Sequence, residues 1–338
     1  MAKTLRAKTL NDTLNTAPRR ADIVEVAPRD GFQSINDPLP TEDKIRCIQS
    51  LLDAGITRLE IGSFVSPKAV PQMADIGEIV AAFVDRPDIR LAALIPNLKG
   101  AELALDSGIR ELVFVVSVSE PHNQSNVRQS VADSLASFET IIERLRALDD
   151  QDRLRMRLDL GTSFDCPYAG RIDWQQVEAV LAPALEMTQG VELEVALCDT
   201  TGRATPYQVA EHFSRLGARY QDDRLSWAFH GHDTYGMGVA NALFALQHGA
   251  TTLDASTAGL GGCPFAPGAT GNTATEDLVY ALQDGQIDIG IDLPRLLEAA
   301  DMIAALPGGQ TASHLRHVPR EKVPREKATR GNENERLG

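Results

Sequence analysis

The sequence predicts an α/β protein that folds as a (β/α)8 (TIM) barrel, and three observations lead to this prediction. Short apolar segments alternate with helix-like segments eight times within about 235 residues, as expected for a closed parallel barrel. Of the 338 residues, 43% are hydrophobic and 24% are charged, which is typical of a globular protein. No GxGxxG or P-loop motif follows the first apolar segment, so an open nucleotide-binding sheet is less favoured.

The expected strands are the eight apolar segments Asp22–Ala27, Thr57–Gly62, Arg90–Ile95, Arg110–Ser117, Arg153–Leu160, Val191–Cys198, Leu225–His230 and Thr251–Ser256. In the fifth and sixth of them, charged residues alternate with apolar ones. Alternate residues share one face of a strand, and barrel strands are covered on their outer side. We therefore expect these charges to point into the barrel and to pair across the two strands. The four residues are Arg155, Arg157, Glu192 and Glu194.

Helical patterns fill the intervals between the strands. One helix is expected after Pro40, with Thr41 as its cap, and another after Asp173, which is a suitable cap. Beyond the eighth strand, two further helical patterns run over about Thr273–Gln283 and Leu293–Ala305. We expect these additional C-terminal helices to cap one end of the barrel.

Composition divides the chain into three parts. Residues 1–21 form a basic N-terminal arm, which we expect to be flexible, and a targeting role for it stays open. Residues 22–306 form the barrel domain with its cap helices. Residues 307–338 are highly charged with few apolar residues, so we expect a disordered tail.

Charge and cysteine usage exclude several classes of protein. The chain has 33 basic and 47 acidic residues, a net charge of −14, which opposes general nucleic-acid binding. No apolar run reaches the roughly 18 residues of a membrane helix. The four cysteines, Cys47, Cys166, Cys198 and Cys263, are widely spaced. This pattern predicts neither a disulfide framework nor a structural zinc site, and it favours a reducing, cytoplasmic location.

The sequence His230-Gly231-His232 is the strongest local sign of chemistry. It falls at the expected end of the seventh strand, where residues two apart face the same way, so both imidazoles can reach one ion. Taken alone, the pattern fits equally well two polar residues at a strand exit.

Two more candidate ligands come from distant parts of the chain. Asp30 follows the first strand directly, and Asn272 lies beyond the eighth. In a closed barrel the first, seventh and eighth strands are neighbours, and their ends open on one rim. Two histidines, a carboxylate and an amide suit Mg²⁺ or Mn²⁺. The alternatives are that Asp30 serves a turn and that Asn272 caps the following helix.

A glycine-rich segment, Gly259-Leu260-Gly261-Gly262-Cys263, follows the eighth strand. A cysteine in such a loop beside the rim is a candidate acid or base, and a buried inert thiol is the alternative. Glu60 and Asp199 are expected at the ends of the second and sixth strands on the same rim. Each can orient a ligand, a proton or Arg29, or form a structural ion pair.

Together these segments resemble the 3-hydroxy-3-methylglutaryl-CoA lyase family, which belongs to a superfamily of metal-dependent lyases and synthases. The matching stretches are Glu25–Gln33, Ser63–Lys68 with Val70–Met73, Pro96–Gly100, Asp199–Gly202, His230–Gly236 and Ala258–Phe265, followed by Gly271–Asn272 and Ala274–Leu278. The resemblance covers roughly residues 22 to 306 and is far more specific than a lone HxH motif.

The resemblance implies a divalent cation and the retro-Claisen cleavage of an acyl-CoA thioester. The implied ligands of the cation are Asp30, His230, His232 and Asn272. The family also implies a homodimer.

The resemblance further implies catalytic roles. Arg29 matches the residue that stabilises the thioester enolate, and Cys263 matches the residue that protonates it. Glu60 matches the residue that positions Arg29. Asp199 or a histidine of the metal site is the candidate base.

Two residues depart from the family pattern near the rim. His122 stands in a stretch that differs from the usual lyase sequence, and Arg203 stands where a small or apolar residue is common. Each is a candidate to read an extra carboxylate or hydroxyl of the substrate, and harmless surface variation is the alternative. Within the matching stretches, Gln33 and Ser63 are further candidate substrate-binding residues.

We therefore expect an acyl-CoA lyase. It would cleave 3-hydroxy-3-methylglutaryl-CoA, or a related 3-hydroxyacyl-CoA, to acetyl-CoA and a 3-oxo acid such as acetoacetate. One alternative is a Claisen-condensing transferase of the isopropylmalate synthase type, although no large C-terminal regulatory domain follows the barrel. The other is a non-catalytic acyl-CoA binder, against which Arg29, Glu60 and Cys263 argue, because binding alone needs no proton donor. Release of free thiol from acetyl-CoA plus an oxo acid would identify the condensing enzyme.

Overall fold

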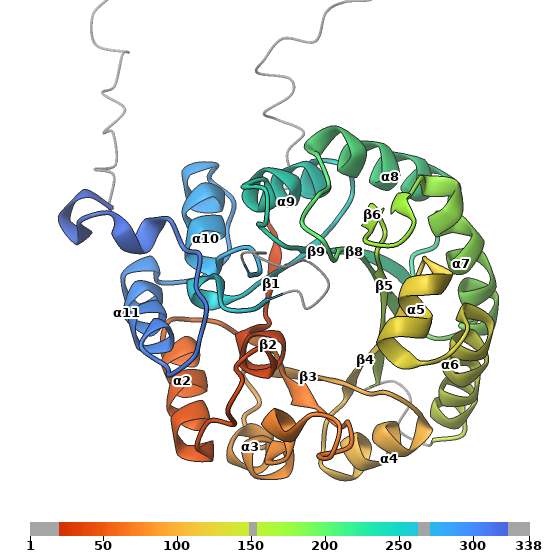
Figure 1. Cartoon of the computed structure of the whole chain (residues 1–338), viewed down its shortest axis with the longest axis horizontal. Helices are drawn as coiled ribbons and strands as arrows, with labels where there is room; N and C mark the ends of the chain where they lie inside the picture. Colours follow the sequence, from red (N-terminus) through yellow and green to blue (C-terminus); the bar gives the residue numbers. More distant parts are fainter. Residues whose placement is uncertain (1–19, 149–153, 263–270, 324–338) are drawn as a thin grey trace, which may run out of the picture.

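A closed barrel of eight parallel strands forms the centre of the protein (Figure 1). The computed structural model describes residues 20–148, 154–262 and 271–323. The barrel strands are β1 (Asp22–Glu25), β2 (Arg58–Ser63), β3 (Arg90–Leu94), β4 (Glu111–Ser117), β5 (Arg155–Gly161), β8 (Leu193–Asp199), β9 (Leu225–Gly231) and β10 (Thr252–Ala255). Pairing of β1 with β10 closes the barrel. The predicted fold is confirmed, and every strand lies within two residues of its expected bounds.

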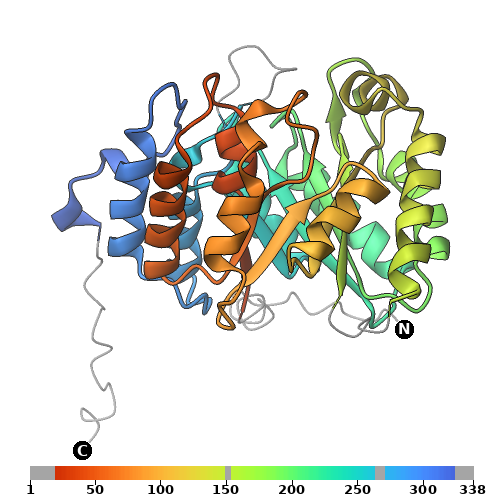
Figure 2. The same ribbon diagram turned by 90° about the horizontal axis from the view of Figure 1, so that it is seen from below.

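Helices pack along the outside of the strands and form a ring around the barrel (Figures 1 and 2). They are α2 (Thr41–Asp53), α3 (Ile76–Phe83), α4 (Leu98–Asp106), α6 (Val131–Arg146), α7 (Trp174–Met187), α8 (Pro206–Arg219), α9 (Gly238–Gln247), α10 (Thr275–Asp284) and α11 (Leu293–Ala304). Each turns an apolar stripe towards the sheet, as α6 does with Leu135, Phe138, Ile142 and Leu145, all of which are buried.

The two predicted helix starts have different outcomes. Asp173 caps α7 as expected, and a reciprocal hydrogen bond with Gln176 completes a capping box. Thr41 does not cap α2. Pro40 occupies the cap position, and the Thr41 hydroxyl instead donates a hydrogen bond to Asp75 Oδ2 at 3.0 Å.

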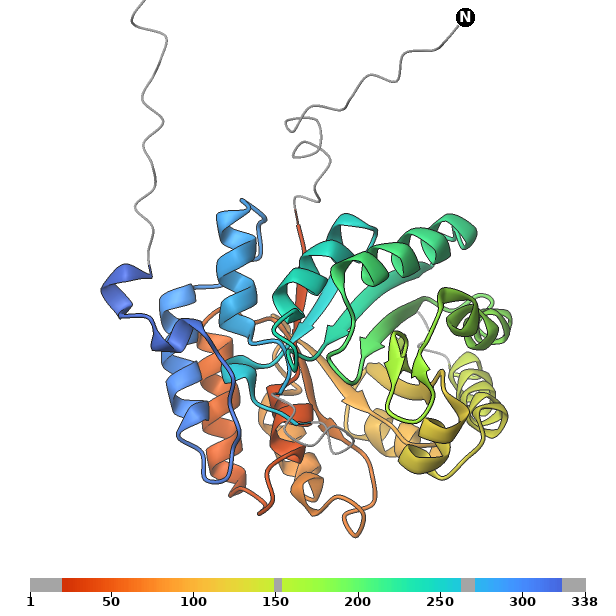
Figure 3. The same cartoon turned by 45° about the horizontal axis from the view of Figure 1, so that its top comes forward.

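The two C-terminal helices lie beside the barrel rather than across one of its ends. Helix α10 packs against α9 and β10, and α11 packs between α10 and α2 (Figures 1 and 3). Both have a buried apolar face, which in α11 includes Leu296, Leu297 and Ile303. A helix with one apolar face is stable along the outer wall of the barrel. These helices therefore complete the ring, and the expectation of a cap over one end is corrected.

Several short elements were not predicted. A π-helical turn, η1 (Ala27–Gly31), follows β1, and a helix, α5 (Glu120–Val127), follows β4. Helix α5 has almost no apolar stripe, and its buried side chains, His122 and Asn123, are polar, so periodicity gave no sign of it. The remaining short elements are the hairpin strands β6 (Asp165–Cys166) and β7 (Gly170–Arg171), and the 3₁₀ turns η2 (Pro71–Met73), η4 (Thr257–Gly259), η5 (Leu315–His317) and η6 (Arg320–Lys322).

The chain continues as ordered structure beyond α11. Leu315 and Val323 are buried in the hydrophobic core, and the Asp277 carboxylate accepts hydrogen bonds from the backbone N–H groups of His314 and Leu315. The prediction of a disordered tail from residue 307 is therefore wrong for residues 307–323, because a few apolar anchors hold this charged stretch. The rest of the predicted tail, 324–338, and residues 1–19 of the predicted arm lie outside the described residues. Within the described ranges, no helix has the length and apolar character needed to span a membrane.

The charged pairs predicted between the fifth and sixth strands are present. Arg157 lies inside the barrel, 3.4 Å from Glu194. Arg155 also pairs with Glu192, at 3.3 Å, but their side chains are 55% and 66% exposed. These two residues lie where β5 and β8 begin, at the amino ends of the barrel strands. The expectation that all four point into a buried interior is corrected for Arg155 and Glu192.

Candidate metal and catalytic site

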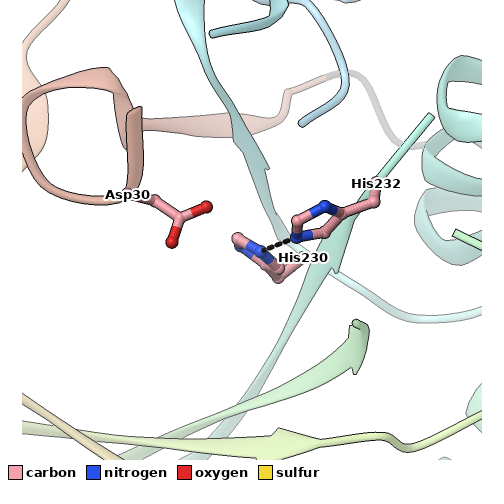
Figure 4. A group of neighbouring side chains, drawn as sticks. All are labelled: Asp30, His230 and His232. Carbon is pink, nitrogen blue, oxygen red and sulfur yellow. Dashed lines mark hydrogen bonds between the residues drawn. The ribbon is translucent and has the colours of Figure 1, made fainter. Parts of the chain in front are cut away.

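The two histidines of the HxH motif lie side by side at the mouth of the barrel. His230 belongs to β9 and His232 follows the strand, so the extended backbone turns both side chains inward. Their Nε2 atoms are 3.4 Å apart, and both side chains are buried (Figure 4). Burial, with the neighbouring His230, lowers the pKa of His232 to about 4, so its imidazole is neutral. A neutral imidazole is the form that binds a metal ion.

Asp30 faces these histidines from the end of β1, which β10 alone separates from β9 in the closed barrel (Figure 4). It stands in η1, which bends the chain over the mouth directly after β1. One candidate ligand atom from each of Asp30, His230 and His232 lies within 4.8 Å of the other two. Burial alone would raise the pKa of Asp30, but the adjacent charge of Arg29, helped by the two histidines, lowers it to about 2. Asp30 is therefore an anionic ligand at neutral pH.

Asn272 joins this group through Asp30. Its Nδ2 donates hydrogen bonds to Asp30 Oδ2 at 2.7 Å and to the Leu260 carbonyl at 3.2 Å. Gly271 makes this approach possible, because a Cβ there would collide with the Gly259 carbonyl. Ala274, not Asn272, stands at the cap position of α10, so the alternative role of Asn272 as a helix cap does not hold.

The four residues fit a metal ion. Among the described residues, the buried Asn272 Oδ1 has no hydrogen-bond partner, and neither has His232 Nδ1. A buried amide oxygen without a partner costs free energy unless a ligand satisfies it. Two imidazoles, one carboxylate and one amide oxygen are a donor set that divalent cations accept. The structure thus brings the four predicted ligands together.

Arg29 links the candidate metal ligand Asp30 to Glu60 of β2. Its Nη1 is 2.5 Å from Asp30 Oδ1, and its Nε and Nη2 lie 2.8 and 2.9 Å from the two Glu60 oxygens. Burial would lower the pKa of Arg29, but Glu60 and Asp30 outweigh it and raise the pKa, so the guanidinium keeps its charge. Glu60 is the third residue of β2 rather than its last. Both of its oxygens contact one edge of the Arg29 guanidinium, which fits the role predicted for a positioning residue.

The structure places Asp199 elsewhere. Both of its carboxylate oxygens accept backbone hydrogen bonds, from Arg203 and Ala204, each at 3.1 Å. Burial raises the pKa of Asp199 to about 7. Cys198, the residue before it, faces the cavity, so on an alternating strand Asp199 faces away. Asp199 supports the loop after β8, and its role as a base stays a prediction without a contact to the site.

A cavity of about 1180 Å³ extends from the metal group across the mouth of the barrel. Arg29, Asp30, His230 and His232 line one part of it. Of the candidate substrate-binding residues, Gln33 and His122 also line it, and His122 Nδ1 lies 2.8 Å from the Ser117 hydroxyl. The size of the cavity suits a ligand larger than a simple organic acid.

The other two candidate substrate-binding residues do not line this cavity. Ser63 is buried, and its hydroxyl donates to the Leu94 carbonyl at 3.3 Å. The Arg203 side chain is 56% exposed and lies over the ring of Tyr235, with 5.6 Å between the guanidinium carbon and the ring centre. The structure does not bring these two residues to the site. Cys263 lies outside the described residues, so its role stays a prediction.

Sequence reasoning missed Asp254, and it placed Arg157 inside the barrel without its role in supporting the site. Asp254 Oδ2 accepts a hydrogen bond from His230 Nδ1 at 3.0 Å, and Arg157 in turn binds Asp254 through two nitrogens. The sequence did contain a sign of Asp254, because a carboxylate in the middle of an apolar barrel strand needs a buried partner. Cys47, Cys166 and Cys198 are free and buried, as the absence of a disulfide framework predicts.

The fold and the site define a (β/α)8-barrel protein with a candidate metal site at the carboxyl ends of its strands, where enzymes of this fold carry out their chemistry. Comparison with known proteins identifies the family. The HMGL-like family matches residues 20–303, and the chain belongs to it.

Three similar proteins illustrate the relationship. The 3-hydroxy-3-isohexenylglutaryl-CoA/hydroxymethylglutaryl-CoA lyase of Pseudomonas aeruginosa is 41% identical over 296 residues, which is 88% of this chain and 96% of that protein. The (R)-citramalyl-CoA lyase of Chloroflexus aurantiacus is 38% identical over 85% of this chain and 90% of its own length. A structure of the HMG-CoA lyase of Acinetobacter baumannii, in complex with coenzyme A and 3-methylmalate, superimposes with a TM-score of 0.81. It is 38% identical and covers 91% of this chain and 98% of that chain. These findings confirm the resemblance predicted from the sequence.

Proposed function

We propose that this carbon–carbon lyase cleaves 3-hydroxy-3-methylglutaryl-CoA, or a close 3-hydroxyacyl-CoA analogue, to acetyl-CoA and a 3-oxo acid. In this reaction the substrate hydroxyl loses its proton, and the C2–C3 bond breaks as C3 becomes a carbonyl. The electron pair of that bond forms a thioester enolate, which then takes a proton. One observation carries the proposal: a buried, permanently charged guanidinium lies beside three convergent metal ligands in a cavity large enough for a thioester substrate.

The ion we propose is Mg²⁺ or Mn²⁺, held by Asp30, His230, His232 and Asn272. When bound, such an ion lowers the cost of removing the proton from the substrate hydroxyl and fixes the orientation of the substrate oxygens. The mixed set of nitrogen and oxygen donors, without any cysteine, favours these ions over a closed structural zinc site.

Arg29 is placed to meet the negative charge of the enolate. Its carboxylate partners hold the guanidinium rigid, so it needs little reorganisation when charge develops on the thioester oxygen. Glu60 contacts one edge of the guanidinium with both of its oxygens, which fixes the plane of the group. Asp199 does not line the cavity, so a histidine of the site is the remaining candidate base.

Replacing Cys263 with alanine is expected to lower kcat about a hundredfold, because a positioned proton donor contributes roughly that much. Mn²⁺ affinity is expected to stay unchanged, since a thiol is not among the proposed ligands. Steady-state kinetics with acetyl-CoA detection, and Mn²⁺ titration of the same preparation, measure both quantities. A Cys263→Ala variant with near-normal kcat would remove this thiol from the mechanism, and Cys47→Ala is the matched control.

The acyl group of the substrate belongs to this proposal. The similar lyases act on different thioesters by their names, 3-hydroxy-3-isohexenylglutaryl-CoA, hydroxymethylglutaryl-CoA and (R)-citramalyl-CoA. A panel of these three thioesters, assayed with Mg²⁺ and with Mn²⁺ and with mass detection of the released acid, tests it. The proposal expects the highest kcat/KM on the hydroxymethylglutaryl thioester, and absence of acetyl-CoA from all three reactions would overturn it.

Arg128 is expected to bind an anionic group of the thioester. Two guanidinium groups line the cavity among the described residues, and Arg29 is already held by Glu60 and Asp30. No carboxylate of the described chain pairs with Arg128, which ends α5 in a left-handed backbone conformation. Arg128→Gln is therefore expected to raise KM about tenfold with kcat unchanged, because hydrogen bonds to charged groups contribute about 1.5–3 kcal/mol.

Thioesters of coenzyme A and of pantetheine, which lacks the nucleotide phosphates, separate the two sources of that anion. If Arg128→Gln raises KM for the CoA thioester alone, Arg128 binds a phosphate. If it raises KM for both thioesters, Arg128 binds the acyl carboxylate. A KM unchanged for both thioesters would contradict the prediction. Arg86, a half-buried arginine that pairs with Asp88 and does not line the cavity, is a suitable control.

A cytoplasmic location, a homodimer and the absence of nucleic-acid and membrane partners complete the proposal. The wide spacing of the cysteines supports the first, the family resemblance the second, and the net charge of −14 opposes nucleic-acid binding. Light scattering after gel filtration tests the dimer, which would be contradicted by a monomer mass of 36.6 kDa at micromolar concentration.

A further inference from the structure

We propose that Arg157 is a positioning residue for the metal centre, which it reaches through Asp254 and His230. The inference rests on the proposed function, because it assumes that His230 is a ligand of the ion. Arg157 itself touches neither the proposed ion nor the substrate. Its effect would be to hold one metal ligand in the orientation in which it can bind.

The first link joins Arg157 to Asp254. Two parallel hydrogen bonds connect them, from Arg157 Nη1 to Asp254 Oδ1 at 2.8 Å and from Nη2 to Oδ2 at 2.5 Å. Arg157 Nε donates to Asp159 Oδ1 at 2.6 Å, so the guanidinium is held on two edges. All three side chains are buried inside the barrel. A paired guanidinium and carboxylate of this kind has a fixed plane as well as a fixed distance.

The second link joins Asp254 to His230. Asp254 Oδ2, the same oxygen that accepts from Arg157 Nη2, also accepts from His230 Nδ1 at 3.0 Å. With its Nδ1 proton used in this way, His230 presents the lone pair of Nε2 towards His232 and Asp30. Carboxylates in this relation to a metal-binding histidine set the tautomer and the ring orientation, and their loss typically weakens metal binding by 10- to 100-fold.

A purely structural role for Arg157 is the competing explanation, because any buried arginine that loses its partners destabilises a fold. The barrel contains a matched control for this effect. Arg58 is as buried as Arg157, and it pairs with Glu111 and Glu194 near the amino ends of the barrel strands. Glu194 also contacts Arg157, at 3.4 Å. Among the described residues, however, no contact joins Arg58 to Asp254. A change at Arg58 therefore removes a buried ion pair without touching the link to His230.

The test compares Arg157→Lys and Arg157→Gln with Arg58→Lys and Arg58→Gln. Mn²⁺ affinity of the metal-stripped proteins is measured from the electron paramagnetic resonance signal of free Mn²⁺, and thermal unfolding is measured in parallel. The lysine variants keep a positive charge and offer folded protein if the glutamine variants fail to fold. Lysine cannot reproduce the two parallel hydrogen bonds to Asp254.

We expect Arg157→Lys to weaken Mn²⁺ binding by about tenfold, and Asp254→Asn to bind Mn²⁺ as weakly or more weakly. At saturating Mn²⁺, kcat is expected to recover to within a few-fold of the wild-type value. The Arg58 variants are expected to lower Tm to a similar degree and to leave Mn²⁺ affinity within twofold. Unchanged affinity in Arg157→Lys, or an equal loss in Arg58→Lys, would overturn the inference while the proposed function stands. A wild-type protein that does not bind Mn²⁺ or Mg²⁺ would instead remove the proposed metal centre, and the inference with it.

Discussion

Replacing Arg29 with glutamine is expected to lower kcat about a thousandfold, which is the upper part of the range for removing one preorganised donor from a site that stabilises a developing oxyanion. Arg29 carries a full positive charge that Glu60 and Asp30 hold rigid. Glutamine is a shorter polar side chain that has neither the charge nor the fork of donors. The enolate would then form in a buried cavity without the counter-charge of this guanidinium.

Arg29→Lys provides the graded comparison. Lysine keeps the charge but cannot satisfy both Glu60 oxygens and Asp30 in the same geometry, so we expect an intermediate kcat. Both variants are assayed at saturating Mn²⁺, with circular dichroism to show that the barrel is folded. If Arg29→Gln retained more than a tenth of the wild-type kcat under these conditions, Arg29 would have no direct part in stabilising the enolate.

Replacing His232 with alanine is expected to weaken Mn²⁺ binding by more than about a hundredfold, because the change removes a ligand rather than a residue that merely orients one. Turnover at a fixed micromolar Mn²⁺ concentration would fall with it. His232 Nδ1 has no hydrogen-bond partner among the described residues, so the substitution breaks no described hydrogen bond at that atom. The loss of affinity would therefore report on the ion rather than on the fold.

His212 is the matched control for this prediction. It is equally buried, in α8, and its Nδ1 is 2.9 Å from the Gln208 carbonyl, well outside the group formed by Asp30 and the two site histidines. His212→Ala is expected to lower Tm and to leave Mn²⁺ affinity unchanged. Equal Mn²⁺ affinity in the wild type and in His232→Ala, measured by the same titration, would displace His232 from the ligand set.

The parts of the site that follow from local rules were predictable from the sequence. Residues two apart on a strand share a face, which brings His230 and His232 together. Closure of an eight-stranded barrel makes the first and last strands neighbours, which brings Asp30 to Asn272 across 242 positions of sequence. Neither step needs knowledge of side-chain packing.

The alternation of side chains along a strand also explains why the prediction for Asp199 was incomplete. The prediction placed Asp199 at the end of a strand without specifying which face of the strand it occupies. The alternation that turns Glu194 into the barrel also turns Cys198 inward and Asp199 outward, and the structure has this arrangement. A carboxylate at the end of a barrel strand is therefore not enough to place it in the active site, because the parity of its position decides which way it points.

The remaining differences depend on packing that no local pattern records. A carboxylate in an apolar strand indicates that Asp254 has a buried partner. That its partners are His230 on the adjacent strand and Arg157 follows only from the structure. The stretch after α11 is rich in charge, yet Leu315 anchors it and the acidic start of α10 binds its backbone. Composition over a window of residues does not reveal one buried leucine with a favourable partner.

The account depends most directly on one ion at the mouth of the barrel that enables C–C cleavage. The decisive measurement follows acetyl-CoA formation from 3-hydroxy-3-methylglutaryl-CoA while Mn²⁺ is titrated into metal-stripped protein. The account predicts no turnover without metal, and a rise that levels off at one equivalent of Mn²⁺ per chain, with acetoacetate and acetyl-CoA formed in equal amounts. Full turnover by the stripped protein, or none at any Mn²⁺ concentration, would contradict it.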